Sequence, residues 1–178
     1  PHMTTENPEA SSIGQGTNQY SNVQLARYIS AIANRGTVFS LSLLDKMTDS
    51  QGNLIEDFSP EVRSHADMAE STWDAVQLGM RRVISNGSAR RIFSDLEVDI
   101  AGKTGTAENL PRGSGEYVVS FIGFAPVENP QVVVYVVIDE LQDNQEDSGA
   151  PTKMAGDILR EVLPYLQIFP EGSENSET

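Results

Sequence analysis

The sequence predicts an α+β fold in which an antiparallel sheet of about three core strands is flanked by helices. Two strand-like apolar runs, residues 117–124 and 132–138, are separated by the turn residues Glu128-Asn129-Pro130, as expected for neighbouring antiparallel strands. Stretches with the apolar spacing of helices precede and follow these runs. A chain of 178 residues with 38% hydrophobic residues also has the size and composition of one globular domain.

The predicted domain covers residues 13–168. Residues 1–12 comprise Pro1-His2-Met3, which resembles a cloning remnant, and a polar stretch that we expect to be disordered. Residues 169–178 are acidic and poor in apolar side chains, which predicts a disordered tail.

The first third of the domain predicts one helix and a strand region. Residues 23–34 form a helix that Gly36 ends, with a stripe of inward apolar positions: Leu25, Ile29, Ile32 and Ala33. Residues 38–47 are strand-like, and residues 49–53 form a hairpin-type turn before residues 54–58.

Ser71 and Thr72 are expected to cap the next helix. Its apolar stripe consists of Trp73, Val76, Met80, Val83 and Ile84. Because Trp73 continues this stripe, we interpret it as a core residue rather than a platform for a ligand.

Residues 96–101 alternate apolar and polar side chains and run into residues 102–107, which predicts a half-buried strand. Together with the two apolar runs, it should form an antiparallel meander. The nearly continuous apolar run at 132–138 implies burial on both faces of the sheet. One cover is the predicted helix 152–166, whose inward stripe is Met154, Ala155, Ile158, Leu159, Val162, Leu163 and Leu166.

The helices at 71–85 and 23–34 are candidates for the opposite face of the sheet. Residues 139–147 carry five acids and are expected to form a mobile, solvated loop.

Charge and composition exclude several classes of function. The net charge of −14 would repel nucleic acid and anionic lipid. The absence of cysteine excludes disulfides and cysteine-bound metals, and His65 is the only histidine outside the presumed remnant, so we expect no metal site and no cofactor. No apolar stretch approaches the length of a membrane span, and we expect the chain itself to be soluble.

The segment Lys103-Thr104-Gly105-Thr106 places chemistry on a predicted strand edge. One cation, two hydroxyl groups and a glycine that permits close backbone approach suit a carboxylate-ended peptide lying alongside the strand. A phosphate-binding loop is excluded because it requires a glycine where this chain has Glu97. An isolated Lys-Thr-Gly also occurs by chance at ordinary strand ends.

Several short segments occur along the chain in a particular order, with the tetrapeptide inside the sixth: residues 13–16, 23–26, 31–36, 79–83, 86–89, 103–107 and 120–126. Because these segments follow one another in the same order as the motifs of class B penicillin-binding proteins, the chain resembles the C-terminal half of their transpeptidase domain over most of residues 13–167. The resemblance implies an incomplete serine transpeptidase or β-lactamase-like fold.

The nucleophile of this family is absent from the sequence. Its Ser-x-x-Lys motif would need serine three residues before a lysine, but those positions are Leu43, Ile100 and Ala150. The one Ser-x-Asn, Ser173-Glu174-Asn175, lies in the acidic tail and is interpreted as a coincidence. Without the activated serine, the chain cannot form an acyl-enzyme by this chemistry.

The resemblance assigns catalytic roles to Lys103 and Thr106 and substrate binding to Lys103, Thr104, Gly105 and Thr106. Lys103 would place positive charge beside the hydroxyl group of the missing Ser-x-Asn. Thr106, expected on the face of Lys103, would bind the carboxylate of a D-alanyl-D-alanine stem peptide or of a β-lactam, and its backbone N–H would supply one oxyanion donor. Thr104, expected on the opposite face, would be structural, and Gly105 would keep the edge open for the substrate backbone.

The resemblance therefore implies the C-terminal portion of a peptidoglycan D,D-transpeptidase that cross-links stem peptides. Its parent would be anchored in the cell membrane, with this part outside the cytoplasm, and its partner would be the missing N-terminal half of the domain. The alternative is a non-catalytic module that binds D-alanyl peptides or a divisome partner through the edge at 103–106. A third possibility is a fragment with one exposed sheet edge, which would dimerise or await its other half.

Overall fold

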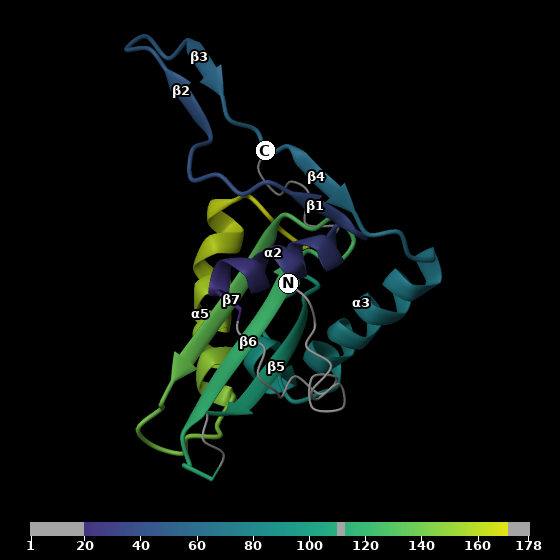
Figure 1. Cartoon of the computed structure of the whole chain (residues 1–178), viewed down its shortest axis with the longest axis vertical. Helices are drawn as coiled ribbons and strands as arrows, with labels where there is room; N and C mark the ends of the chain where they lie inside the picture. Colours follow the sequence, from purple (N-terminus) through teal and green to yellow (C-terminus); the bar gives the residue numbers. More distant parts are fainter. Residues whose placement is uncertain (1–19, 110–112, 171–178) are drawn as a thin grey trace, which may run out of the picture.

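A three-stranded antiparallel sheet forms the centre of the computed structural model, which describes residues 20–109 and 113–170. The strands β5 (Ala101–Glu108), β6 (Tyr117–Ala125) and β7 (Val132–Asp139) are ordered β5-β6-β7 (Figure 1). The predicted α+β fold with an antiparallel meander is therefore confirmed. The glycine turn at 13–16 and the Ser-x-Asn at 173–175 lie outside the described residues.

Helices cover both faces of this sheet (Figure 1). On one face lie α5 (Gly149–Tyr165) and the short α4 (Arg90–Phe93), which pack against Phe121. On the other face, α2 (Asn22–Ala33) and α3 (Glu70–Ser85) pack around Phe124. The two phenylalanines lie an odd number of positions apart on β6, so their side chains point to opposite faces. The prediction of helices on both faces is confirmed.

The α5 core stripe is narrower than the sequence predicted. Ala155, Leu159 and Leu163 are buried, whereas Met154 and Ile158 are 49% and 42% exposed. The exposed residues lie one position before buried ones, so they fall on the flank of the helix. The described residues place no element against this flank of α5.

The two long N-terminal helices begin differently. Ser21 and Gln24 form a capping box at the start of α2, in which the Ser21 hydroxyl accepts from the Gln24 N–H at 3.3 Å. The predicted cap of α3 is wrong, since the helix begins at Glu70 and its N-cap, Ala69, makes no side-chain cap bond. Trp73 is 5% exposed, as predicted for a core residue.

The predicted strand at 96–107 begins later, at Ala101. Asp99 is bound by Arg81 of α3, while Val98 and Ile100 are buried in the core beside α5. This segment therefore packs against helices in place of pairing in the sheet. Its alternation of apolar and polar residues reflects burial on one side, which is the same signal that a strand would give.

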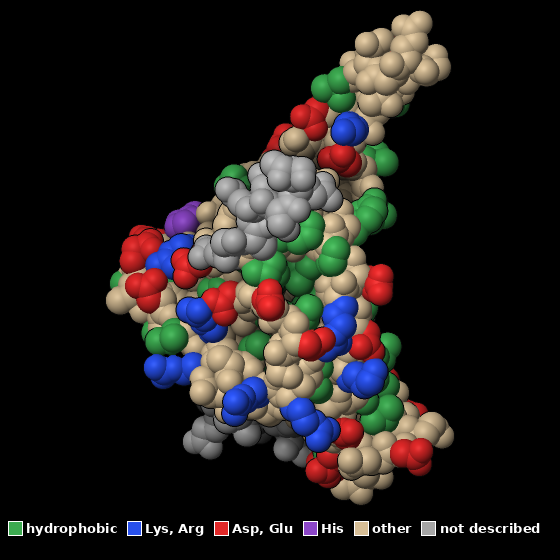
Figure 2. All heavy atoms as spheres, turned by 180° about the vertical axis from the view of Figure 1, so that it is seen from behind, with side chains coloured by type: hydrophobic (Ala, Val, Ile, Leu, Met, Phe, Trp, Pro, Cys, Tyr) green, Lys and Arg blue, Asp and Glu red, His purple; other side chains and the backbone are tan. Residues whose placement is uncertain are grey.

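The predicted strand at 38–47 is two short strands, β1 (Thr37–Phe39) and β2 (Lys46–Thr48). The first pairs with β4 (Val62–His65), which the sequence did not predict, and the second forms the predicted hairpin with β3 (Leu54–Asp57). This hairpin projects from the body of the protein as an arm (Figures 1 and 2). Every residue of β2 and β3 is exposed.

Candidate substrate-binding edge

The tetrapeptide Lys103-Thr104-Gly105-Thr106 lies in the middle of β5, an outer strand of the three-stranded sheet. Among the described residues β5 pairs only with β6, so its other side is an open edge. Lys103 and Thr106 are exposed, and the two residues between them are half-buried. The residues that the sequence singled out therefore occupy an accessible sheet edge, where an extended peptide could add as a further strand.

The predicted orientation of Thr106, on the same face as Lys103, is wrong. The pairing of β5 with β6 runs without a register shift, from Ala101 opposite Phe124 to Glu108 opposite Tyr117. Side chains of a regular strand alternate between faces, so Thr104 and Thr106 share one face. Lys103 and Gly105 occupy the other. The hydroxyl groups and the ammonium group therefore flank the edge from opposite sides.

Hydrogen bonds hold all three polar side chains of the tetrapeptide. The Lys103 Nζ donates to the Thr104 carbonyl at 2.6 Å, so the side chain lies along its own strand. The hydroxyl groups of Thr104 and Ser88 are 3.5 Å apart, which links the strand to the turn after α3. The Thr106 hydroxyl donates to the Glu146 carbonyl at 3.3 Å.

The two glycines of β5 differ in how tightly they are packed. A Cβ on Gly102 would lie 2.5 Å from the buried Phe121 ring and 3.1 Å from the Ile122 carbonyl oxygen, so packing within the sheet requires glycine there. A Cβ on Gly105 would lie 2.6 Å from the Ser120 Oγ, which is the end of a side chain that can rotate away.

Sequence reasoning missed the residues that surround the end of β5. Glu146 lies 40 positions from Thr106, in the loop at 139–147 that was predicted to be mobile and solvated. A hydrogen bond to the Glu146 carboxylate raises the pKa of Tyr117 on β6, with further contributions from burial and from the charge of Glu108. The Asn109 side chain also donates to Asp139 at 3.1 Å. No local pattern could have revealed these contacts, because they join segments distant in sequence.

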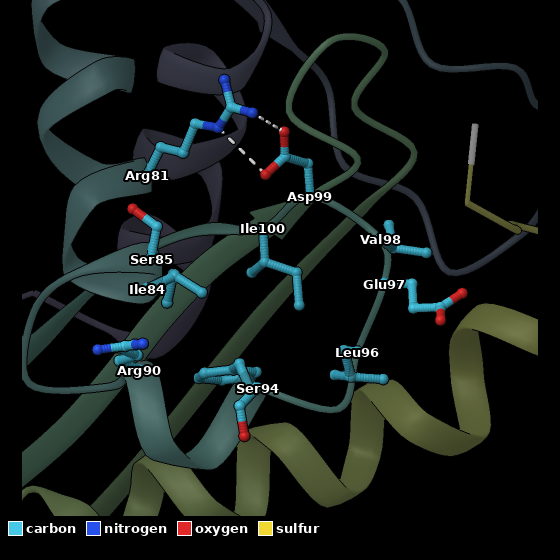
Figure 3. A pocket seen from close by; sticks show the side chains of 11 residues that line it. Arg81, Ile84, Ser85, Arg90, Ser94, Leu96, Glu97, Val98, Asp99 and Ile100 are labelled. Carbon is cyan, nitrogen blue, oxygen red and sulfur yellow. Dashed lines mark hydrogen bonds and ion pairs between the residues drawn. The ribbon is translucent and has the colours of Figure 1, made fainter. Parts of the chain in front are cut away.

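An ion pair between Arg81 of α3 and Asp99 holds the segment that leads into β5. Figure 3 shows the Arg81 guanidinium directed at both carboxylate oxygens of Asp99, and the Nε donates at 3.1 Å. Below this pair is a cavity of about 310 Å³, lined by residues of α3, α4 and 96–100. No residue of the tetrapeptide lines the cavity. The residues around the cavity hold the segment that leads into β5, but they do not form part of the substrate-binding edge.

The described part of the chain holds no group of three or more acidic, histidine or cysteine side chains that could bind a metal ion. Within that part, no helix is long and apolar enough to cross a membrane.

Comparisons with known proteins agree with the resemblance read from the motifs. The family model of the penicillin-binding protein transpeptidase domain matches residues 4–160. Penicillin-binding protein H of Bacillus subtilis is 33% identical over 148 residues, which are 76% of this chain and 21% of that protein. Stage V sporulation protein D of the same organism is 28% identical over 166 residues, covering 90% of this chain and 25% of that protein.

A solved structure shares the fold. The D,D-transpeptidase domain of a peptidoglycan glycosyltransferase from Eggerthella lenta superimposes with a TM-score of 0.69 at 27% identity, covering 87% of this chain and 34% of that one. The chain spans about a quarter of the length of the curated relatives it matches. On the family match, the shared fold and the open β5 edge, the chain belongs to the transpeptidase domain family of class B penicillin-binding proteins.

Proposed function

We propose that this chain is the C-terminal portion of a peptidoglycan D,D-transpeptidase and supplies the strand edge that binds the substrate. The observation that carries the proposal is the open edge of β5, with Lys103 and Thr106 exposed in its middle. A stem peptide ending in D-alanyl-D-alanine, or a β-lactam, would lie along this edge as an added strand. Thr106 would donate to its carboxylate, and Lys103 would contribute positive charge.

In the complete domain, a serine outside this chain would attack the penultimate D-alanyl carbonyl and release the terminal D-alanine. The acyl-enzyme formed in this step would then transfer its acyl group to the amine of a second stem peptide. The Thr106 backbone N–H would serve as an oxyanion donor, a contribution that is typically worth about 3 kcal/mol of transition-state stabilisation. We also propose that the whole protein is anchored in the membrane, with this part outside the cytoplasm. Protease protection of the full-length protein in intact cells tests that topology.

Thr104 has a supporting role in this proposal. Its hydroxyl is 3.5 Å from that of Ser88, so it ties the strand to the turn after α3. Thr106 is exposed, whereas Thr104 is half-buried, which favours Thr106 as the carboxylate ligand.

A second candidate function is peptide binding without catalysis. It is favoured by one observation: these 178 residues contain no Ser-x-x-Lys. In that case the same edge would hold D-alanyl peptides or a divisome partner, and no covalent chemistry would follow.

Two measurements test these proposals. Titration of the ¹⁵N-labelled chain with an acetylated D-alanyl-D-alanine peptide should give saturable shifts along β5 that Thr106→Val abolishes. The control Thr48→Val changes an exposed strand threonine on the projecting arm and should leave binding intact. Shifts elsewhere, or binding that survives Thr106→Val, would exclude the edge as the site.

Intact-mass spectrometry after incubation with penicillin detects a covalent adduct, which would form on this chain alone only if the chain were a complete enzyme. We expect no adduct on this chain alone, because it lacks the motif that activates the serine. We expect one adduct when the preceding part of the domain is joined to it. An adduct on the chain alone would refute the partial-site interpretation. An unmodified complete domain would favour the non-catalytic module.

A further inference from the structure

The loop between β7 and α5 contacts the candidate edge at Glu146. Its backbone carbonyl accepts the hydrogen bond of the Thr106 hydroxyl at 3.3 Å. A threonine hydroxyl has one hydrogen to donate. A ligand carboxylate that requires this hydrogen must therefore compete with Glu146 for it.

Two further features tie the loop to the sheet. The Asn109 side chain donates to Asp139 at the start of the loop at 3.1 Å, and interaction with the Glu146 carboxylate raises the pKa of Tyr117 on β6. Glu140 and Asn144 adopt left-handed backbone conformations, with φ of 52° and 50°, that non-glycine residues rarely take. Such conformations persist only where surrounding contacts impose them. The loop that carries Glu146 is therefore anchored at its start and contains two constrained backbone conformations.

The negative charge of the Glu146 side chain, like its backbone carbonyl, disfavours binding of a carboxylate at Thr106. The side chain is exposed and belongs to a loop with several other acids. A second carboxylate brought to Thr106 is repelled by this charge, and the repulsion weakens as salt is raised. Only a ligand with further contacts along β5 overcomes both effects.

We propose that Glu146 is a specificity-determining residue of this edge, which opposes carboxylates at Thr106 through its carbonyl and its charge. The inference rests on the proposed function, because it concerns ligands of that edge. Glu146 would weaken the binding of small anions at Thr106, whereas an extended peptide with a terminal carboxylate would still bind through its further contacts with β5. A weak neutral bond at 3.3 Å is replaced readily by a shorter, charge-assisted bond to such a peptide.

The test compares two peptides on three forms of the chain. The peptides are acetylated D-alanyl-D-alanine and the same peptide with a C-terminal carboxamide. The forms are the wild type, Glu146→Gln and the control Glu140→Gln. The control removes one negative charge from the same loop, and its side chain has no bonding partner among the described residues. Titrations followed by ¹⁵N spectra yield Kd for each pair.

We expect Glu146→Gln to tighten binding of the carboxylate peptide by about 2- to 10-fold, the size of one close charge. Binding of the carboxamide should change less than twofold, and Glu140→Gln should change neither. This shift in carboxylate selectivity would not arise from a merely structural role, which would affect both peptides equally. The gain in Glu146→Gln should also shrink as salt is raised.

The outcomes separate this inference from the function on which it rests. If no form binds either peptide, the proposed function is wrong and the inference falls with it. If the wild type binds but Glu146→Gln behaves like Glu140→Gln, or tightens both peptides equally, only the inference is overturned. Binding that appears in Glu146→Gln and is absent from the wild type would support it.

Discussion

Gly102→Ala should be among the most damaging small substitutions in this protein. The new Cβ would lie 2.5 and 2.9 Å from two atoms of the Phe121 ring and 3.1 Å from the Ile122 carbonyl oxygen. Phe121 is fully buried and packs against Phe93 with ring centroids 5.2 Å apart, so the ring has no free space to enter. Overpacking of a dense core typically costs 1–3 kcal/mol. We expect the upper end, about 3 kcal/mol of unfolding free energy.

Urea denaturation followed by circular dichroism measures this loss. The matched control is Gly79→Ala in α3, where a Cβ meets no atom within 4 Å. Because alanine favours helix over glycine, this control should gain about 0.5–1 kcal/mol. Gly102→Ala combined with Phe121→Leu should recover at least 1 kcal/mol relative to the sum of the single changes, since the smaller side chain vacates the contact. A loss below 0.5 kcal/mol in Gly102→Ala alone would refute the steric reasoning.

Three further predictions concern other parts of the molecule. Arg160 lowers the pKa of Asp95 from 3.8 to about 2, so this pair stabilises the fold above the ordinary pKa of an aspartate and the effect fades as the pH falls toward 2. The urea midpoints of the wild type and Asp95→Asn should therefore differ at pH 6, begin to converge below about pH 4 and nearly coincide at about pH 2; a constant difference would contradict this. Trp73→Ala should cost about 3–5 kcal/mol because the indole is 5% exposed, and circular dichroism should follow the unfolding since no other tryptophan remains. Ile55→Asn on the projecting arm should change the unfolding free energy by less than about 0.5 kcal/mol because the side chain is 59% exposed, and a larger loss would mean that the arm packs against the body.

Much of the fold was accessible from local sequence patterns. The run at 132–138 and its neighbour at 117–124 became adjacent antiparallel strands because each is long, apolar and bounded by turn residues. The turn at 49–53 joined a hairpin for the same reason. Residues 96–100 misled the prediction because burial on one side produces the same alternation whether or not the backbone pairs in a sheet. β4 was missed because its residues, Val62–His65, are exposed and its pairing partner is distant in sequence.

Some features of the candidate edge could likewise be predicted from the sequence, and others could not. The sequence by itself determined that Lys103, Thr104 and Thr106 would share one short strand, since this follows from chain order and residue type. It also determined that the activating Ser-x-x-Lys is absent from these 178 residues. Strict alternation along a regular strand places Thr104 and Thr106 on the same face. The prediction that Thr106 shares the face of Lys103 was wrong because it departed from this alternation.

Only the tertiary structure decided what surrounds that strand. Ser88 reaches Thr104 because α3 ends beside β5, and Glu146 reaches Thr106 because the β7–α5 connection folds back over the strand end. Gly102 must be glycine because the Phe121 ring of the next strand occupies the space of its side chain. These contacts join segments separated by 16 to 40 positions. Their geometry arises from packing the whole chain around two cores, which no local pattern of residues encodes.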